Sequence, residues 1–218
     1  RCTQGLTCRG GAQILRPNDY RHVLTDPTDL PATPQAPIAY LTEPLKDLAA
    51  WVRYFSEAEI PVLADTAIAL EDLRAREDDV DPGMLAAVIE ADPLLTIKFM
   101  AHVATKRRPG DVTETETVMS SLVMTGVAPF FRNFGPQPTV EDRLHDQPEA
   151  LEGLREILLR GSRAAHFAMA FAVHRGDTDV SVIHQAAYLH DFAEMLMWCH
   201  APTLALDIRA KQQANTTL

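Results

Sequence analysis

Hydrophobic residues after position 42 recur at spacings of three and four, which is the period of one helix face. The first such series consists of Leu45, Leu48, Ala49, Val52 and Phe55. Thr42 is placed to cap that helix, with Pro44 in its first turn. A longer series predicts a helix over 149–175, which Gly176 ends. No segment alternates with the period of a β-strand, so the sequence predicts an all-α body.

The start of the chain has a different composition, with no helical period, a Gly-Gly pair and several prolines. This composition predicts an irregular leader over 1–41, followed by a helical domain over 42–218. Cys2 and Cys8 lie in the leader without the paired spacing of a zinc site, so we interpret them as free thiols.

The 218 residues carry a net charge of −10, which disfavours a nucleic-acid-binding surface because such a surface needs a basic stripe. No apolar run approaches the ~20 residues of a membrane helix, and no signal-peptide pattern is found. Three cysteines suit a reducing compartment better than a disulfide framework. We therefore expect a cytoplasmic protein that binds neither nucleic acid nor membrane.

The segment 184–196 is mostly apolar, yet it places the pair His190-Asp191 inside the apolar run. If buried, these groups need a hydrogen-bonding partner, a metal or a water network. The pattern predicts one continuous helix over 179–199. Adjacent helical residues point about 100° apart, so a metal site would need a further histidine and carboxylate from a facing helix. Glu194 stands four residues after His190, where an ion pair between the two is the simpler interpretation.

Other histidines have simpler structural interpretations. His166 lies on the apolar side of its helix, where a hydrogen-bonded core histidine is expected, and His102 is interpreted in the same way. His174 lies in a last helical turn, where the helix dipole favours a cation. We expect His145 and His200 to face solvent.

Four segments in order resemble the HDOD family, which comprises bacterial signalling-output domains related to HD-type metal-dependent phosphohydrolases. They are Ile60–Leu63, Ile89–Lys98, Val118–Gly126 and Ala186–Asp191. The first opens the domain, and the last resembles the family's A-x-L-L-H-D helix. No Gly-rich phosphate loop, nucleophile elbow or Cys-His constellation competes with this resemblance. It implies an all-α, HD-like multi-helix bundle of HDOD type over about 58–200.

The departures from the HD pattern are as informative as the matches. Counted without gaps, Gly161 stands where catalytic relatives have a metal-binding histidine on the preceding helix. Glu194 replaces a lysine that could neutralise phosphate, and Asp207 is the only later aspartate, in surroundings that match no motif. The resemblance therefore implies that hydrolysis is lost, with no cofactor and a vestigial pair, His190 and Asp191.

Three functions follow as alternatives. The first is a non-catalytic bacterial signalling domain that binds a protein partner or a small effector. The second is a divergent HD-type phosphohydrolase acting on a nucleotide or other phosphoester. It would hold a divalent metal with His166, His184, His190 and Asp191. The third is an interaction module that forms a homodimer through the leader or through phenylalanines that we otherwise expect in the core. These are Phe130, Phe131 and Phe134.

Overall fold

The structure, a computed structural model, describes residues 39–106 and 116–216. The chain divides into two units, Arg1–Gln35 and Ala36–Leu218, and every described residue belongs to the second. The free-thiol interpretation of Cys2 and Cys8 and most of the predicted leader lie outside the described residues.

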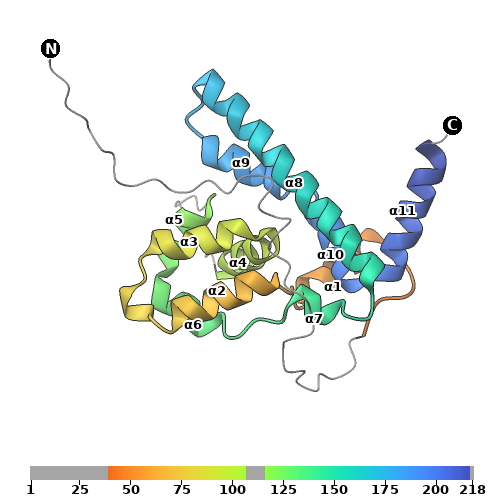
Figure 1. The fold of residues 1–218 in the computed structure, drawn as a ribbon, viewed down its shortest axis with the longest axis horizontal. Coiled ribbons are helices and arrows are strands. Elements are labelled where there is room, and N and C mark those ends of the chain that lie inside the picture. Colours follow the sequence, from red (N-terminus) through yellow and green to blue (C-terminus); the bar gives the residue numbers. More distant parts are fainter. Residues whose placement is uncertain (1–38, 107–115, 217–218) are drawn as a thin grey trace, which may run out of the picture. The chain divides into compact units, whose positions relative to one another are not determined.

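The regular elements of the described residues are helical (Figure 1). In chain order they are α1 (Leu48–Glu57), α2 (Ala64–Arg74), the short 3₁₀ helix η2 (Glu77–Asp79), α3 (Pro82–Ala91), α4 (Pro93–Lys106), α5 (Val118–Thr125), α6 (Val127–Asn133), α7 (Val140–Arg143), α8 (Pro148–Arg175), α9 (Val180–Tyr188), α10 (Phe192–His200) and α11 (Pro202–Thr216). Over these residues, β-type pairing is confined to one isolated bridge between Val62 and Thr139. The prediction of an all-α fold is confirmed.

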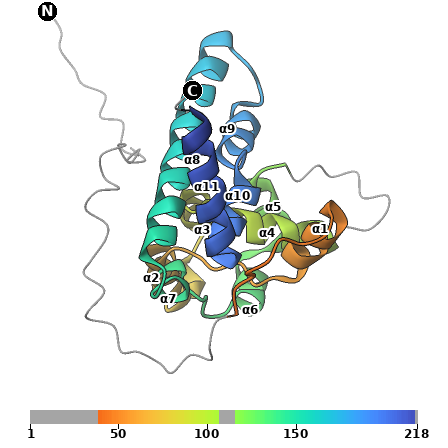
Figure 2. The same cartoon turned by 90° about the vertical axis from the view of Figure 1, so that its right-hand side faces the viewer.

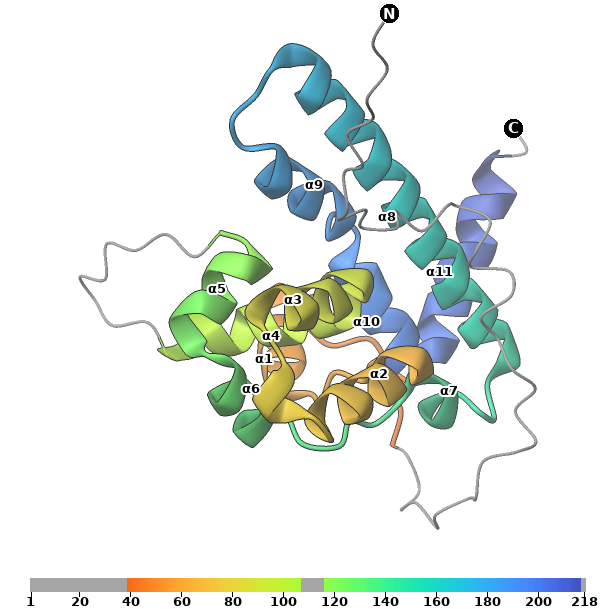
Figure 3. The same ribbon diagram turned by 60° about the vertical axis from the view of Figure 1, so that its left-hand side comes forward.

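The side chains of these helices form two hydrophobic clusters. The first contains side chains from each of the helices α2, α3, α4, α5 and α6. Among them, Leu85, Leu122 and Phe130 are fully buried. The second joins α7, α8, α10 and α11 around Leu154 and Trp198. Helix α4 contributes to both clusters, with Phe99 in the first and Leu94 in the second. Figure 3 shows α10 beside α4, and Figure 2 shows α11 alongside α8.

The phenylalanines of α6 and its C-terminal boundary belong to the first cluster. Phe130 and Phe134 stack with their ring centroids 4.6 Å apart, and Phe99 meets Phe130 edge to face at 5.5 Å. Phe131 is buried as well. The interpretation of these residues as core is therefore confirmed, and the alternative of an exposed dimer patch at this place is wrong.

Helix α1 differs from its sequence prediction in both its start and its buried face. It begins after Asp47, whose carboxylate accepts a hydrogen bond from the Ala50 backbone N–H at 2.8 Å, instead of after Thr42. Leu48 and Val52, predicted to face inward, are 78% and 57% exposed. Phe55, which belongs to the same predicted series, is half-buried as expected. Trp51 and Tyr54 lie beside it in place of Leu48 and Val52.

Asp92 joins the first two segments of the family resemblance. Its buried carboxylate accepts hydrogen bonds from the backbone N–H groups of Leu94 and Leu95, which begin α4, and from that of Leu63. The first two bonds cap the helix, and the third fixes the Ile60–Leu63 segment against it. Helix α4 therefore begins directly after Asp92.

Candidate functional site

The His190-Asp191 pair lies at a break between two helices. The predicted continuous helix over 179–199 is wrong, because α9 ends at Tyr188 and α10 begins at Phe192. The Tyr188 hydroxyl donates to the Ala91 carbonyl at 3.0 Å, which ties the end of α9 to α3. The following helix packs its buried residues into the second cluster. The break lets each helix follow its own tertiary contacts.

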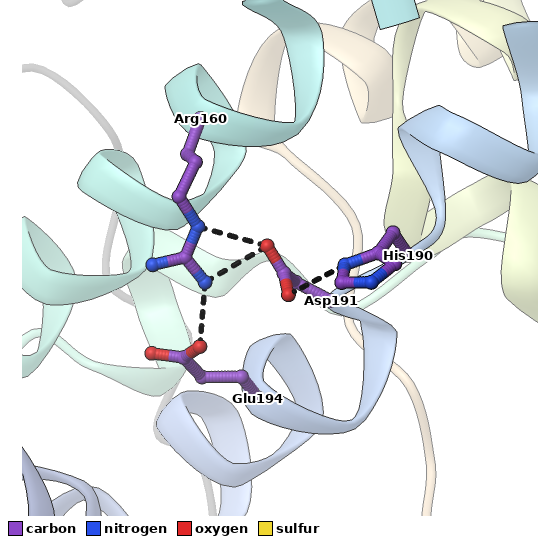
Figure 4. A network of polar contacts seen from close by, with 4 residues as sticks. All are labelled: Arg160, His190, Asp191 and Glu194. Atoms are coloured by element: carbon purple, nitrogen blue, oxygen red, sulfur yellow. Dashed lines mark hydrogen bonds and ion pairs between the residues drawn. The ribbon is translucent and has the colours of Figure 1, made fainter. Parts of the chain in front are cut away.

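Arg160 of α8 binds both carboxylates of this turn (Figure 4). Its Nε and one terminal nitrogen each lie 2.8 Å from Asp191 Oδ2, and the same terminal nitrogen lies 2.7 Å from Glu194 Oε2. The other oxygen of Asp191 accepts from His190 Nδ1 at 3.0 Å. One guanidinium therefore bridges two carboxylates that α10 brings together, an arrangement with charge-assisted hydrogen bonds.

The position of His190 corrects the predicted ion pair with Glu194. Its side chain is 79% exposed, although it follows an apolar run. Glu194 binds Arg160 and not His190, because the helix break removes the i,i+4 geometry. The Asp191 side chain is well covered, so it is the more buried member of the pair.

The contacts between Arg160 and the two acids favour the charged forms of Asp191 and Arg160. Burial alone would raise the pKa of the Asp191 carboxyl, but hydrogen bonds and charge from Arg160 and His190 outweigh it and lower the pKa. Burial likewise opposes the charged Arg160 guanidinium, while Glu194 and Asp191 raise its pKa overall. Asp191 is therefore ionised at neutral pH and is held by a permanent cation.

Gly161, next to Arg160, packs against the same turn. A Cβ atom built on it would lie 3.0 Å from the Tyr188 carbonyl oxygen and 3.5 Å from Met195 Cε. Backbone atoms cannot move aside as a flexible side chain can, so the α8–α9 packing has little room for any side chain there. In this packing, a histidine at position 161 would displace the end of α9.

His166 of α8 and His184 of α9 lie close to each other, farther along α8 than the Arg160 contacts. Their ring centroids are 6.4 Å apart, and His166 Nδ1 lies 2.8 Å from the Ser162 carbonyl oxygen. Burial, followed by the neighbouring His166, lowers the pKa of His184. His166 lies six residues beyond Arg160, about 9 Å along the helix axis. Within the described ranges, no three His, Cys, Asp or Glu residues are grouped closely enough to hold a metal ion.

An apolar cleft of about 660 Å³ lies beside the His190 turn. Helix α4 forms one wall and the α9–α10 turn forms the other. The lining residues are Ile97, Met100, Ala101, Val103, Ala104, Ala186, Leu189, His190 and Phe192. This volume lies within the range of small-molecule sites. The sequence did not reveal the cleft, because apolar residues of a helix face look the same whether they line a cleft or fill a core.

The opposite end of α10 carries a second polar contact, at His200. The sequence prediction of a solvent-facing His200 is wrong, since only 2% of the residue is exposed. An Arg143 terminal nitrogen lies 3.1 Å from its Nδ1, and Arg143 Nε donates to the Cys199 carbonyl at 2.6 Å. Because Arg143 can only donate, Nδ1 is the acceptor and Nε2 carries the proton, with no hydrogen-bond partner in the described part of the chain. Burial, with a smaller effect of Arg143, lowers the pKa of His200 to about 4.

The remaining histidines agree more closely with the sequence. His145 is exposed, as predicted, and His174 occupies the last turn of α8. His166 has the hydrogen bond expected of it but is only half-buried. His102 packs edge to face on Phe134 with the ring centroids 5.1 Å apart, and its Nε2 has no partner among the described residues.

Comparison of the chain with family models, with curated proteins and with solved structures gives no match. Among the described helices, none is both long and apolar enough to cross a membrane. Inferences about function therefore rest on the residues and geometry of this chain.

Proposed function

We propose that the chain is a non-catalytic bacterial regulatory domain of the HDOD type, with an HD-like helix bundle, which acts in the cytoplasm by binding a protein partner or a small effector. The order of the four resembling segments supports the family. The observation that carries the non-catalytic part is the bridge from Arg160 to Asp191 and Glu194.

The Arg160 bridge bears on catalysis because a divalent metal and a guanidinium compete for the same carboxylate oxygens. In an HD-type site, Asp191 would be a metal ligand. Here one of its oxygens accepts both Arg160 contacts and the other accepts the His190 N–H. A metal ion would have to displace a cation that already neutralises part of the charge of the two acids, so the network supports a structural role for the pair.

The apolar cleft supports a place for an effector. Leu189, His190 and Phe192 line it, and all three belong to the turn that carries Asp191 or to its edges. A ligand bound there would touch the same backbone that the Arg160 bridge fixes. Binding and the conformation of the turn would then be linked, because a ligand shifts an equilibrium toward the state that it contacts better.

The test is hydrolysis of an activated phosphodiester, bis-p-nitrophenyl phosphate, with Mn²⁺ or Mg²⁺ present. We expect no hydrolysis that depends on Asp191: the purified protein and Asp191→Asn should give equal rates. Asp207→Asn is the matched control, since Asp207 is exposed on α11 and lies outside the network.

A divergent phosphohydrolase remains the alternative. It would need His166 and His184 to join His190 and Asp191, which requires α8 and α9 to shift relative to the turn. Metal-dependent hydrolysis that is abolished by Asp191→Asn and by His184→Ala, but kept by Asp207→Asn, would contradict the non-catalytic proposal and favour this one.

A further inference from the structure

The second half of α8 exposes two large aromatic side chains. Phe167 is 69% exposed and Phe171 is 67% exposed. Four residues separate them, so they are neighbours on one helix face. Single exposed apolar residues are common, but two adjacent phenylalanines form a patch that water solvates poorly.

This face is opposite to the face that packs on the rest of the domain. At about 100° per residue, Gly161, Ala165 and Ala172, which are buried, lie about 120–160° around the helix from Phe167. Helix α9 packs along α8 (Figure 1). The phenylalanines therefore point away from the second hydrophobic cluster and its neighbouring helices.

The same face carries the arginines Arg163 and Arg175 in a protein whose net charge is −10. Arg163, Phe167, Phe171 and His174 fall within about 80° of arc, and Arg175 follows at the helix end. No aspartate or glutamate occurs from position 157 to position 175, nor in α9. The nearest acid with a recorded contact is Asp177, 3.4 Å from Arg175.

We infer that this stripe, from Arg163 to Arg175, is a docking surface for an acidic amphipathic helix of a partner protein. The partner's apolar residues would cover the two phenylalanines, and its carboxylates would face the cations. The stripe is about 18 Å long and one helix wide, which suits helix-on-helix packing. A second copy docked through the same face would oppose arginine to arginine, so charge favours an acidic partner.

This inference goes beyond the proposed function, because the stripe uses none of the Asp191, Glu194 or cleft contacts. Hydrolysis and metal measurements probe Asp191 and the α9–α10 turn, whereas binding to the stripe probes side chains of α8 that begin three residues after Arg160 and contact neither Asp191 nor Glu194. The two proposals can therefore fail separately.

The test is fluorescence anisotropy with the full chain and a labelled helical peptide of about 20 residues, with leucines on one face and glutamates elsewhere. A second peptide with lysines in place of the glutamates tests charge. We expect the acidic peptide to bind with a Kd of about 1–100 µM and the basic peptide to bind at least about 10-fold more weakly.

Two variants locate the site. Phe167→Ser/Phe171→Ser should weaken binding of the acidic peptide at least about 10-fold, because it removes the apolar centre of the contact. Arg163→Glu/Arg175→Glu should weaken it as well and should reduce the salt dependence of binding. Leu48→Ser/Val52→Ser is the matched control, since these residues are a similarly exposed i,i+4 pair on α1, and it should bind within about twofold of the natural chain.

Circular dichroism and thermal unfolding confirm that each variant is folded before binding is compared. Three outcomes would overturn the inference: no binding of the acidic peptide, equal binding of both peptides, or equal loss in the α1 control. Binding of single-stranded DNA or anionic vesicles that depends on Phe167 and Phe171, without peptide binding, would overturn it in favour of a different partner class.

Discussion

An arginine from an earlier helix binds at each end of α10, in each case next to a histidine. At the start, Arg160 binds the carboxylates beside an exposed His190. At the end, Arg143 binds the Cys199 carbonyl and the ring of a buried His200. The first contact is ionic and open to water, whereas the second is made mostly to uncharged groups and is enclosed.

This difference decides what each end can do. Exposed ion pairs contribute about 0–1 kcal/mol and can be exchanged, so the start of α10 suits a surface that responds to a ligand. Hydrogen bonds to a buried polar group stabilise chiefly by avoiding an unpaired partner, which costs about 1–3 kcal/mol. We therefore expect the end of α10 to anchor the fold and the start of α10 to be adjustable.

The largest expected effect concerns pH and His200. Its pKa is about 4 in the folded chain, compared with 6.5 for an ordinary histidine. Between these values the unfolded chain binds a proton and the folded chain does not, so the stability present above pH 6.5 is lost as pH falls toward 4. The loss attributable to this group is about 3 kcal/mol.

The measurement for His200 is the urea-unfolding free energy from pH 7 to pH 4 for the natural chain and for His200→Gln. Glutamine keeps an acceptor for Arg143 but cannot take the proton. The free energy of unfolding of the natural chain, relative to that of His200→Gln, should decrease as the pH is lowered from 6.5 toward 4. Parallel curves would show that His200 is not the buried neutral group described.

The next effect concerns Arg143. Arg143→Met keeps much of the side-chain volume but removes both donors, leaving the Cys199 carbonyl and His200 Nδ1 without this partner. We expect a loss of about 2 kcal/mol in the free energy of unfolding. Arg155→Met on α8 is the control, because Arg155 makes a surface ion pair with Glu152. Equal losses in both variants would contradict the enclosed anchor.

A smaller effect is expected at the other end. Arg160→Met should cost about 1 kcal/mol or less, because the Arg160 side chain is 53% exposed and screened by water. Raising the salt concentration to about 1 M should shrink the difference from the natural chain. If Arg160→Met lowered the free energy of unfolding more than Arg143→Met does, the start of α10 and not its end would be the stronger anchor.

The smallest effect is expected at His190. His190→Ala removes a mostly exposed ring with one hydrogen bond to Asp191, so unfolding should change by about 0.5 kcal/mol or less. Thermal and urea unfolding of the variant provide the measurement. A loss of several kcal/mol would mean that the ring is buried in solution, as the apolar sequence around it had suggested.

Sequence reasoning succeeded where structure depends on near neighbours. The end of α8 at Gly176, which the sequence predicts, depends on one residue: Gly176 adopts a positive φ, which favours glycine. The starts of α3 and α4 are local in the same way, because Asp81 and Asp92 each accept a hydrogen bond from the first turn of the following helix. A capping box between Thr117 and Ser120 begins α5, which is a further boundary set by near neighbours.

Sequence reasoning failed where burial depends on distant segments. His200 was assigned to solvent from its neighbours in the chain, and the structure buries it. The exposure of His190 did not follow from the apolar residues around it. Arg160 was passed over because 31 positions separate it from Asp191, and no spacing rule connects them. The one available signal was its place beside Gly161, the residue that departs from the HD pattern.

The central claim is that Arg160 occupies the carboxylates that a metal would need. Electron paramagnetic resonance of Mn²⁺ titrated into the protein tests it most directly, with Arg160→Met and Arg160→Met/Asp191→Asn as partners. We expect no binding tighter than about 1 mM in the natural chain, and weak new binding in Arg160→Met that Asp191→Asn removes. Stoichiometric micromolar binding by the natural chain that is lost in Asp191→Asn would contradict the account.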